Sequence, residues 1–241
     1  MKNQSQLKYS IGIDIGGTKI KAILLAQKKI VKNIKILTPN TSRELKHALQ
    51  SIVKKLKPSK ENFLIGIGAP GVIKNTFLLL PPNIPKVKKF DFRKIFSKNI
   101  PLLVDNDARC FLKSELVYGS TKKERSVFGF TIGTGVGRAY AKNGIVQKIK
   151  KFERPELWEK EYQKIKDEKK FTLLAKFLGQ KLSLMIKQYN PEIIIIGGGV
   201  LKNRNFFKKL CRELKRQEIK SEIKCSKLGE NAVSIGAVLI D

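Results

Sequence analysis

A strand-like run that ends in a glycine turn occurs twice in this chain of 241 residues. Residues 11–18 read Ile-Gly-Ile-Asp-Ile-Gly-Gly-Thr, and residues 128–135 read Phe-Gly-Phe-Thr-Ile-Gly-Thr-Gly. Neither copy matches the P-loop or the dinucleotide-binding glycine pattern. Glycines directly after a buried strand allow a tight turn whose backbone N–H groups can approach a bound phosphate. The repeat therefore predicts two similar halves, each with a related turn.

The order of predicted strands and helices also repeats. In the first half we expect strands at 9–15, 18–25, 30–37, 63–68 and 101–104, and helices at 42–57 and 108–117. In the second half we expect strands at 126–132, 136–142, 145–149, 192–196 and 219–225, and helices at 171–189, 203–217 and 232–240. Residues 151–170 are polar and predict irregular structure. The pattern predicts an α/β protein of two lobes, each with a mixed sheet flanked by helices, and an interdomain cleft. We expect the N-terminal lobe to comprise residues 1–108 and 230–241, and the C-terminal lobe to comprise residues 109–229.

The two glycine turns are candidates for holding the phosphates of a nucleotide such as ATP from both sides of that cleft. The residues concerned are Gly16, Gly17, Thr18 and Lys19, and Gly133, Thr134 and Gly135. Gly198 and Gly199 follow a buried isoleucine run and would allow a flat adenine or ribose to approach. For each turn, an ordinary structural turn is the alternative.

Asp14 interrupts the first strand with a carboxylate, which is costly to bury without a partner. A Mg²⁺ ion, bound directly or through water, is one such partner, and a structural hydrogen bond is the alternative. Arg138, directly after the second turn, is a further candidate for a phosphate contact.

Asp107 is the candidate general base, because it stands where a strand ends and a helix begins. Helix capping is the alternative role for this carboxylate. A helix N-terminus lowers the pKa of a nearby carboxyl, so we expect a weak base. Asn83 and Asn106 lie on stiff loops suited to bonding substrate hydroxyls, and Gly71 could approach a substrate through its backbone.

The composition sets limits on location and partners. The formal charge is +30, with 41 lysines and 9 arginines spread along the chain. Diffuse lysine predicts a solvated surface, so we do not expect nucleic acid as a partner; binding of a polyanion is the alternative. No apolar run reaches membrane-spanning length, and the first ten residues lack an apolar signal core, so we expect a cytoplasmic protein. Three dispersed cysteines and one histidine make a zinc site unexpected.

Seven segments in order resemble the ROK family (repressor, open reading frame, kinase) of sugar kinases, within the actin-like ATPase, ribonuclease H-like superfamily. They are IGIDIGGTKIKAILL, GIGAPGVI, LPPNIP, VDNDARCFLKSELVYGS, TIGTGVG, IIIIGGGV and LGENAVSIGAVLI. The resemblance implies ATP-dependent, Mg²⁺-assisted phosphorylation of a hexose hydroxyl, as in glucokinase, by a homodimer. It implies Asp107 as the base, Asp14 as the Mg²⁺ residue, and Asn83, Asn106 and Asp107 as sugar contacts.

The chain departs from the family after the second turn. Residues 138–170 contain no His and no Cys, so the family's sugar-binding histidine and zinc cluster are missing. Glu153 is a candidate replacement for the family's sugar-binding glutamate. The leading hypothesis is a minimal, zinc-free hexose kinase. The alternatives are a kinase of another hydroxylated acceptor and a non-catalytic nucleotide or sugar sensor.

Overall fold

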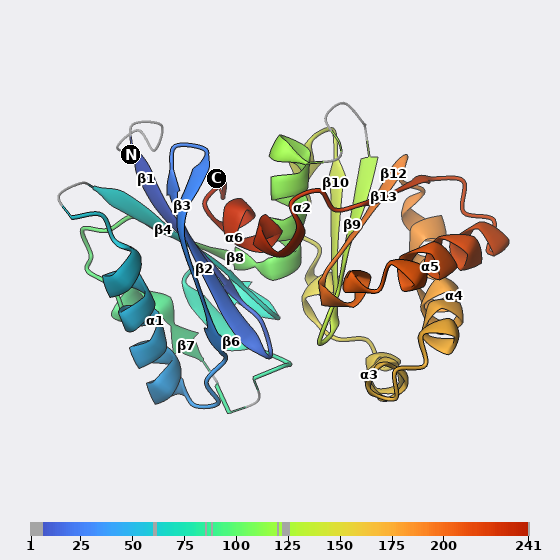
Figure 1. The fold of residues 1–241 in the computed structure, drawn as a ribbon, viewed down its shortest axis with the longest axis horizontal. Coiled ribbons are helices and arrows are strands. Elements are labelled where there is room, and N and C mark those ends of the chain that lie inside the picture. Colours follow the sequence, from blue (N-terminus) through green and yellow to red (C-terminus); the bar gives the residue numbers. More distant parts are fainter. Residues whose placement is uncertain are drawn as a thin grey trace. The chain divides into compact units, whose positions relative to one another are not determined.

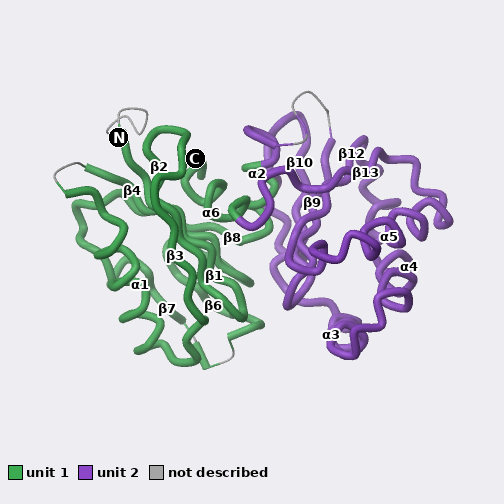
Figure 2. The backbone as a smooth tube through the Cα atoms, in the orientation of Figure 1, with its two compact units in different colours: residues 1–114, 231–241 green, residues 115–230 purple. Residues whose placement is uncertain are grey.

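The computed structural model describes residues 7–240 except 60, 61, 85, 88, 120 and 122–125. The chain forms two compact units, coloured separately in Figure 2. The first unit comprises Met1–Ser114 and Asn231–Asp241, and the second comprises Glu115–Glu230. Each unit has its own cluster of buried apolar side chains.

The first unit contains a five-stranded sheet in the order β3-β2-β1-β4-β8. Its strands are β1 (Tyr9–Ile15), β2 (Lys19–Ala26), β3 (Lys29–Leu37), β4 (Phe63–Ala69) and β8 (Leu102–Asn106). The first three strands are antiparallel neighbours, whereas β1, β4 and β8 run parallel. The carboxyl ends of β1, β4 and β8 therefore meet at one edge of the sheet.

Helices cover both faces of this sheet (Figure 1). Helix α1 (Ser42–Leu56) begins at a capping box formed by Thr41 and Glu44, and its apolar stripe packs into the same core as Ile11 and Ile13. Helix α6 (Ala232–Ala237) lies on the other face, where Gly12 leaves room for the backbone of Ser234. Neighbouring residues of a strand point to opposite faces, so Ile11 and Gly12 serve the two helices separately.

The second unit repeats this sheet in the order β11-β10-β9-β12-β13. Its strands are β9 (Ser126–Ile132), β10 (Val136–Lys142), β11 (Ile145–Val146), β12 (Ile193–Gly197) and β13 (Glu222–Cys225). Strand β9 pairs antiparallel with β10 and parallel with β12, as β1 does with β2 and β4. The repeated motif thus lies on equivalent strands, and the predicted mixed α/β fold is confirmed.

The remaining helices are α2 (Asp107–Tyr118), α3 (Glu159–Asp167), α4 (Phe171–Tyr189) and α5 (Arg204–Arg216), with 3₁₀ turns η2 (Phe92–Lys94), η3 (Lys150–Glu153), η4 (Gly199–Lys202) and η5 (Gly229–Asn231). Helix α2 begins in the first unit, and α3, α4 and α5 belong to the second unit. Asn190, which follows the last residue of α4, adopts a left-handed conformation. Asn203, which precedes α5, caps that helix with a side chain that accepts a hydrogen bond from Phe206 N. Among the helices that the structure describes, none is long and apolar enough to cross a membrane.

Several boundary predictions are wrong. Residues 151–170 are not irregular, since they contain the end of η3 and all of α3. A small sheet of β5 (Val72–Lys74), β6 (Phe77–Leu80) and β7 (Phe90–Asp91) was not predicted. Strands β11 and β13 and helix α6 are shorter than expected. Pro85, in the predicted rigid segment, lies outside the described residues.

Candidate active site

Two carboxylates lie at the carboxyl edge of the first sheet. Asp14 on β1 is in register with Gly68 on β4, and Gly68 is in register with Asp105 on β8. Asp14 is half-buried and shares the sheet face of Gly12, the face that α6 covers. The edge therefore places Asp14 and Asp105 two strands apart, at the same level of the sheet.

The first glycine turn joins β1 to β2 beside Asp14. Gly16 N donates to Lys19 O at 3.0 Å, which closes the turn. Thr38, just after β3, donates from its hydroxyl to Gly16 O at 2.7 Å and from its backbone N to Thr18 O at 3.0 Å. Thr18 and Lys19 are exposed, so the turn is fixed from the sheet side while these side chains face solvent.

Asp107 is the first residue of α2 and is half-buried. Its carboxylate accepts a hydrogen bond from Ala108 N at 2.9 Å. Burial raises the pKa of Asp107 to about 6, and the Ala108 hydrogen bond and the charge of Arg109 only partly oppose this effect. The prediction of a lowered pKa is therefore wrong, because desolvation exceeds the effect of the helix terminus.

Asn106 is buried at the end of β8 and connects two parts of the site. Its Nδ2 donates to Gly71 O at 3.1 Å, and its Oδ1 accepts from Ala108 N at 3.0 Å. Gly71 has φ +87°, and a Cβ on it would lie 2.0 Å from Leu80 O, so only glycine fits there. Asn83 is half-buried in the nearby turn after β6.

Arg109 and Asp105 were not predicted as site residues from the sequence. Arg109 is 6% exposed, and its Nε donates to Asp105 Oδ1 at 2.7 Å. The Nη2 atom of Arg109 makes a second, short contact with the same oxygen. An acidic and a basic residue four apart could have suggested this pair. It places a buried positive charge two residues from Asp107.

The second glycine turn joins β9 to β10 in the other unit. Gly133 N donates to Gly135 O at 2.9 Å. Gly198 has φ +101° and packs on the backbone of Ile132, so that a Cβ would lie 2.4 Å from Ile132 O. The second turn and the glycines after β12 are thus neighbours, as expected if both contact one nucleotide.

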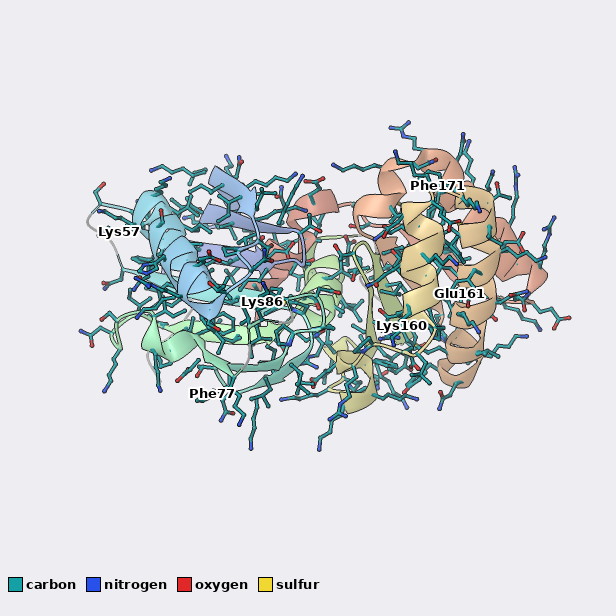
Figure 3. All side chains as sticks on the ribbon, turned by 90° about the horizontal axis from the view of Figure 1, so that it is seen from below. Lys57, Phe77, Lys86, Lys160, Glu161 and Phe171 are labelled. Carbon is teal, nitrogen blue, oxygen red and sulfur yellow. The ribbon has the colours of Figure 1, made fainter. Side chains whose placement is uncertain are left out.

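A cavity of about 540 Å³ lies between the start of α4 and the start of α5, next to η4. Three lysines and several polar side chains line it, together with Phe171, which Figure 3 labels. The lining residues are Lys169, Lys170, Phe171, Thr172, Leu173, Asn203, Asn205, Phe206 and Lys209. No sequence motif marked this cavity, because its two walls are about 30 positions apart in the chain.

Glu153 and Arg138 are both buried in the second unit. Glu153 ends η3, and the structure does not bring it into the unit that carries Asn83 and Gly71. Arg138 Nη2 lies 2.8 Å from Glu159 Oε1 and donates to Arg154 O at 2.7 Å. One nitrogen of Arg138 thus has partners within the second unit.

The oxygen ligands near the first glycine turn suit a Mg²⁺ ion that is also bound by a nucleotide. Among the residues that the structure describes, no group of three or more His, Cys, Asp or Glu side chains is arranged to hold a metal. Mg²⁺ is commonly held by one or two carboxylates together with substrate phosphates and water. Asp14, beside a turn suited to phosphate, fits an ion that arrives with a nucleotide.

Two α/β units with the same strand order and a glycine turn in each define the actin-like ATPase fold. The ROK family model matches residues 10–150, and the chain belongs to the ROK family. A glucokinase from Streptomyces coelicolor is 33% identical over 136 residues, which cover 53% of this chain and 42% of that protein. An N-acetyl-D-glucosamine kinase from Photobacterium profundum is 33% identical over 143 residues, covering 56% and 46%. The matched region thus spans less than half the length of these relatives.

Solved structures show the same fold over nearly the whole chain. A ROK glucokinase from Streptomyces griseus in complex with glucose and AMPPNP has a TM-score of 0.82 at 20% identity, covering 95% of this chain and 98% of that one. A ROK family transcriptional regulator, a homologue of the E. coli MLC protein, has a TM-score of 0.77 at 16% identity, covering 96% and 77%. The fold is therefore shared by kinases and a regulator, and function must be argued from the site.

Proposed function

We propose that the chain is an ATP-dependent sugar kinase that transfers the γ-phosphoryl group of ATP to a hexose hydroxyl. The observation that carries this proposal is the environment of Asp107. This half-buried carboxyl at the carboxyl edge of the sheet has a pKa raised to about 6. A base with such a pKa is largely ionised at pH 7 and still accepts a proton readily. The glucokinase and N-acetylglucosamine kinase relatives support the same class of reaction.

In the proposed reaction, Asp107 accepts the proton of the sugar hydroxyl while the oxygen of that hydroxyl attacks the γ-phosphorus. The bond between the γ-phosphorus and the bridging oxygen breaks, and ADP leaves with that bond's electron pair. Mg²⁺ bound with the nucleotide would neutralise negative charge on the phosphates. Asp14 would hold this ion. Most of the rate enhancement would come from positioning and electrostatic stabilisation.

We assign the nucleotide to the two glycine turns and to the glycines after β12. The phosphates would be bound by Gly16, Gly17, Thr18 and Lys19, and by Gly133, Thr134 and Gly135. Gly198 and Gly199 would lie near the adenosine. The cavity beside η4 would receive part of the nucleoside. Asn203, one of the residues that line it, directly follows η4, which starts at Gly199.

We assign the sugar to Gly71, Asn83, Asn106, Asp107 and Glu153. The bond from Asn106 to the Gly71 carbonyl supports a role for Asn106 in shaping the substrate loop as well as in contacting hydroxyls. Glu153 is buried and belongs to the second unit.

The test is an ADP-release screen over hexoses and N-acetylated amino sugars with MgATP, with mass detection of the phosphorylated product. The proposal expects one or more sugars to gain a single phosphate. ATP binding with no product from any sugar would support a sensor, for which the shared fold of the regulator is a precedent. Light scattering of the same sample tests the proposed homodimer.

The charge of +30 motivated the alternative of polyanion binding, which requires lysines gathered on one face. In the view of Figure 3, nitrogen-tipped side chains project from both units and in all directions rather than from one patch. This distribution favours a solvated surface. We therefore keep nucleic acid outside the proposed partners.

A further inference from the structure

Helix α3 holds the second glycine turn through three side chains of one helical face. Tyr162 Oη donates to Gly133 O at 2.6 Å, and Gln163 Nε2 donates to Thr134 O at 3.4 Å. Glu159 Oε2 accepts from Val136 N at 3.2 Å, just after the turn. Residues at i, i+3 and i+4 of a helix are neighbours, so one helix can contact three consecutive parts of the turn.

Arg138 fixes α3 against strand β10. One carboxylate oxygen of Glu159 lies 2.8 Å from Arg138 Nη2, and the other bonds Val136 N. The guanidinium also lies 5.9 Å from the centre of the Trp158 ring. This buried ion pair joins a residue of β10 to a residue of α3. Helix α3 is therefore held in one position relative to the turn.

The directions of the Gly133 and Thr134 carbonyl groups determine the directions of the N–H groups of the residues that follow them. In a trans peptide unit, the C=O of one residue and the N–H of the next point in opposite directions. The carbonyls of Gly133 and Thr134 are bonded to side chains of α3. The N–H groups of Thr134 and Gly135 are therefore directed away from α3. Successive N–H groups that point to one side form an anion-binding concavity.

Tyr162 is suited to this role as a permanent donor. Its side chain is fully buried, and burial followed by the charge of Glu159 raises the pKa of its hydroxyl. The hydroxyl therefore keeps its proton at any physiological pH. Its O–H group is therefore always available to donate to the Gly133 carbonyl.

We propose that Tyr162 and Gln163 are positioning residues that orient the Gly133–Gly135 peptides so that their N–H groups bind a nucleotide phosphate. This inference rests on the proposed nucleotide site but concerns residues that no motif assigns. It also gives the segment after residue 150 a function other than sugar contact. In this proposal Tyr162 and Gln163 act through the turn and do not themselves contact the nucleotide.

The experiment compares Tyr162→Phe with Tyr189→Phe in the full chain. Tyr162→Phe keeps the buried ring and removes one hydroxyl. Tyr189→Phe is a matched control, because Tyr189 packs on Phe128 and Phe152 at the other end of β9. Titration calorimetry measures the dissociation constant for Mg·AMPPNP, and thermal melting measures the fold. Hydrogen exchange measures the protection of the turn amides.

Tyr162→Phe is expected to weaken Mg·AMPPNP binding by roughly three- to tenfold, the effect of one hydrogen bond. It should also speed exchange at residues 133–136, and the sugar dissociation constant should stay unchanged. Equal affinity for Mg·AMPPNP in Tyr162→Phe and Tyr189→Phe would overturn the inference. If Tyr162→Phe does not fold, Gln163→Ala, on the half-buried side of α3, is judged by the same criterion. A wild-type chain that binds no Mg·AMPPNP would refute the proposed function itself, and this inference with it.

Discussion

The side-chain amide of Asn106 donates a hydrogen bond to the carbonyl of Gly71 at 3.1 Å, across 35 positions of sequence. The same side chain caps α2, because its oxygen accepts from Ala108 N. One buried residue thus fixes both the loop after β4 and the start of the helix that carries Asp107. The candidate base and the candidate substrate loop are therefore held in a fixed relation.

Asn106→Asp should damage this relation, because it replaces the donor to Gly71 O with a carboxylate oxygen. We expect a loss of about 1–3 kcal/mol in the free energy of unfolding. The KM for the sugar should rise more than the KM for ATP. Urea unfolding and steady-state kinetics measure these effects, with Asn99→Asp on an exposed loop as the control. Unchanged stability and sugar KM in Asn106→Asp would show that the Gly71 bond is dispensable.

Substitution by alanine should affect stability at Gly198 and nucleotide binding at Gly133. Gly198→Ala places a Cβ against Ile132 at φ +101°, so it should destabilise the chain by about 1–3 kcal/mol. No described atom lies within 4 Å of a Cβ at Gly133. Gly133→Ala should therefore unfold like wild type but bind nucleotide more weakly, since the methyl group would occupy the space of the ligand. If Gly133→Ala binds nucleotide normally, that turn does not contact it closely.

The raised pKa of Asp107 predicts opposite pH trends in activity and stability. Activity requires the ionised base, so kcat should fall about tenfold for each pH unit below 6. The folded state holds the proton more tightly than the unfolded chain, so this group's contribution to stability is present below pH 3.8 and is lost as pH rises through about 6. Chemical unfolding from pH 4 to 7, compared with Asp107→Asn, isolates that contribution. A pH–rate profile with no acid limb near pH 6 would contradict the assignment.

Arg109 and Asp105 should shift the acid limb of the pH–rate profile, which reports the pKa of Asp107, in opposite directions. The positive charge of Arg109 lowers the pKa of Asp107, and the negative charge of Asp105 raises it. Arg109→Gln should therefore move the limb to higher pH. Adding Asp105→Asn should move it back towards the wild-type position. The pH dependence of kcat in the single and double variants measures both shifts, and a limb that stays in place in Arg109→Gln would exclude electrostatic tuning by this pair.

The repeated motif allowed most of the fold to be predicted from sequence. Residues 11–18 and 128–135 lie on equivalent strands, β1 and β9, because alternating apolar residues before glycines specify a buried strand and a turn locally. Helix α3 was missed because only Glu159, Tyr162 and Ile165 are buried in an otherwise charged segment. Such a helix is stabilised by tertiary contacts and shows little apolar periodicity.

The candidate site was predicted less completely than the fold. Local motifs identified Asp14, Asp107 and both glycine turns as candidates. The partners of Arg138 were not predictable, because Glu159 lies 21 positions away and meets it only in the folded unit. The pKa of Asp107 was misjudged because the helix terminus is visible in sequence, whereas burial by surrounding atoms is not.

The most direct test of the central claim is sugar-dependent ADP release by Asp107→Asn, measured beside its affinity for Mg·AMPPNP. We expect release to fall by about a thousandfold, the scale of general-base catalysis, while nucleotide affinity stays within twofold of wild type. Asp167→Asn, which alters an exposed carboxylate on α3, should behave like wild type. If Asp107→Asn releases ADP as fast as wild type with the same sugar, Asp107 is not the base and the proposed mechanism is wrong.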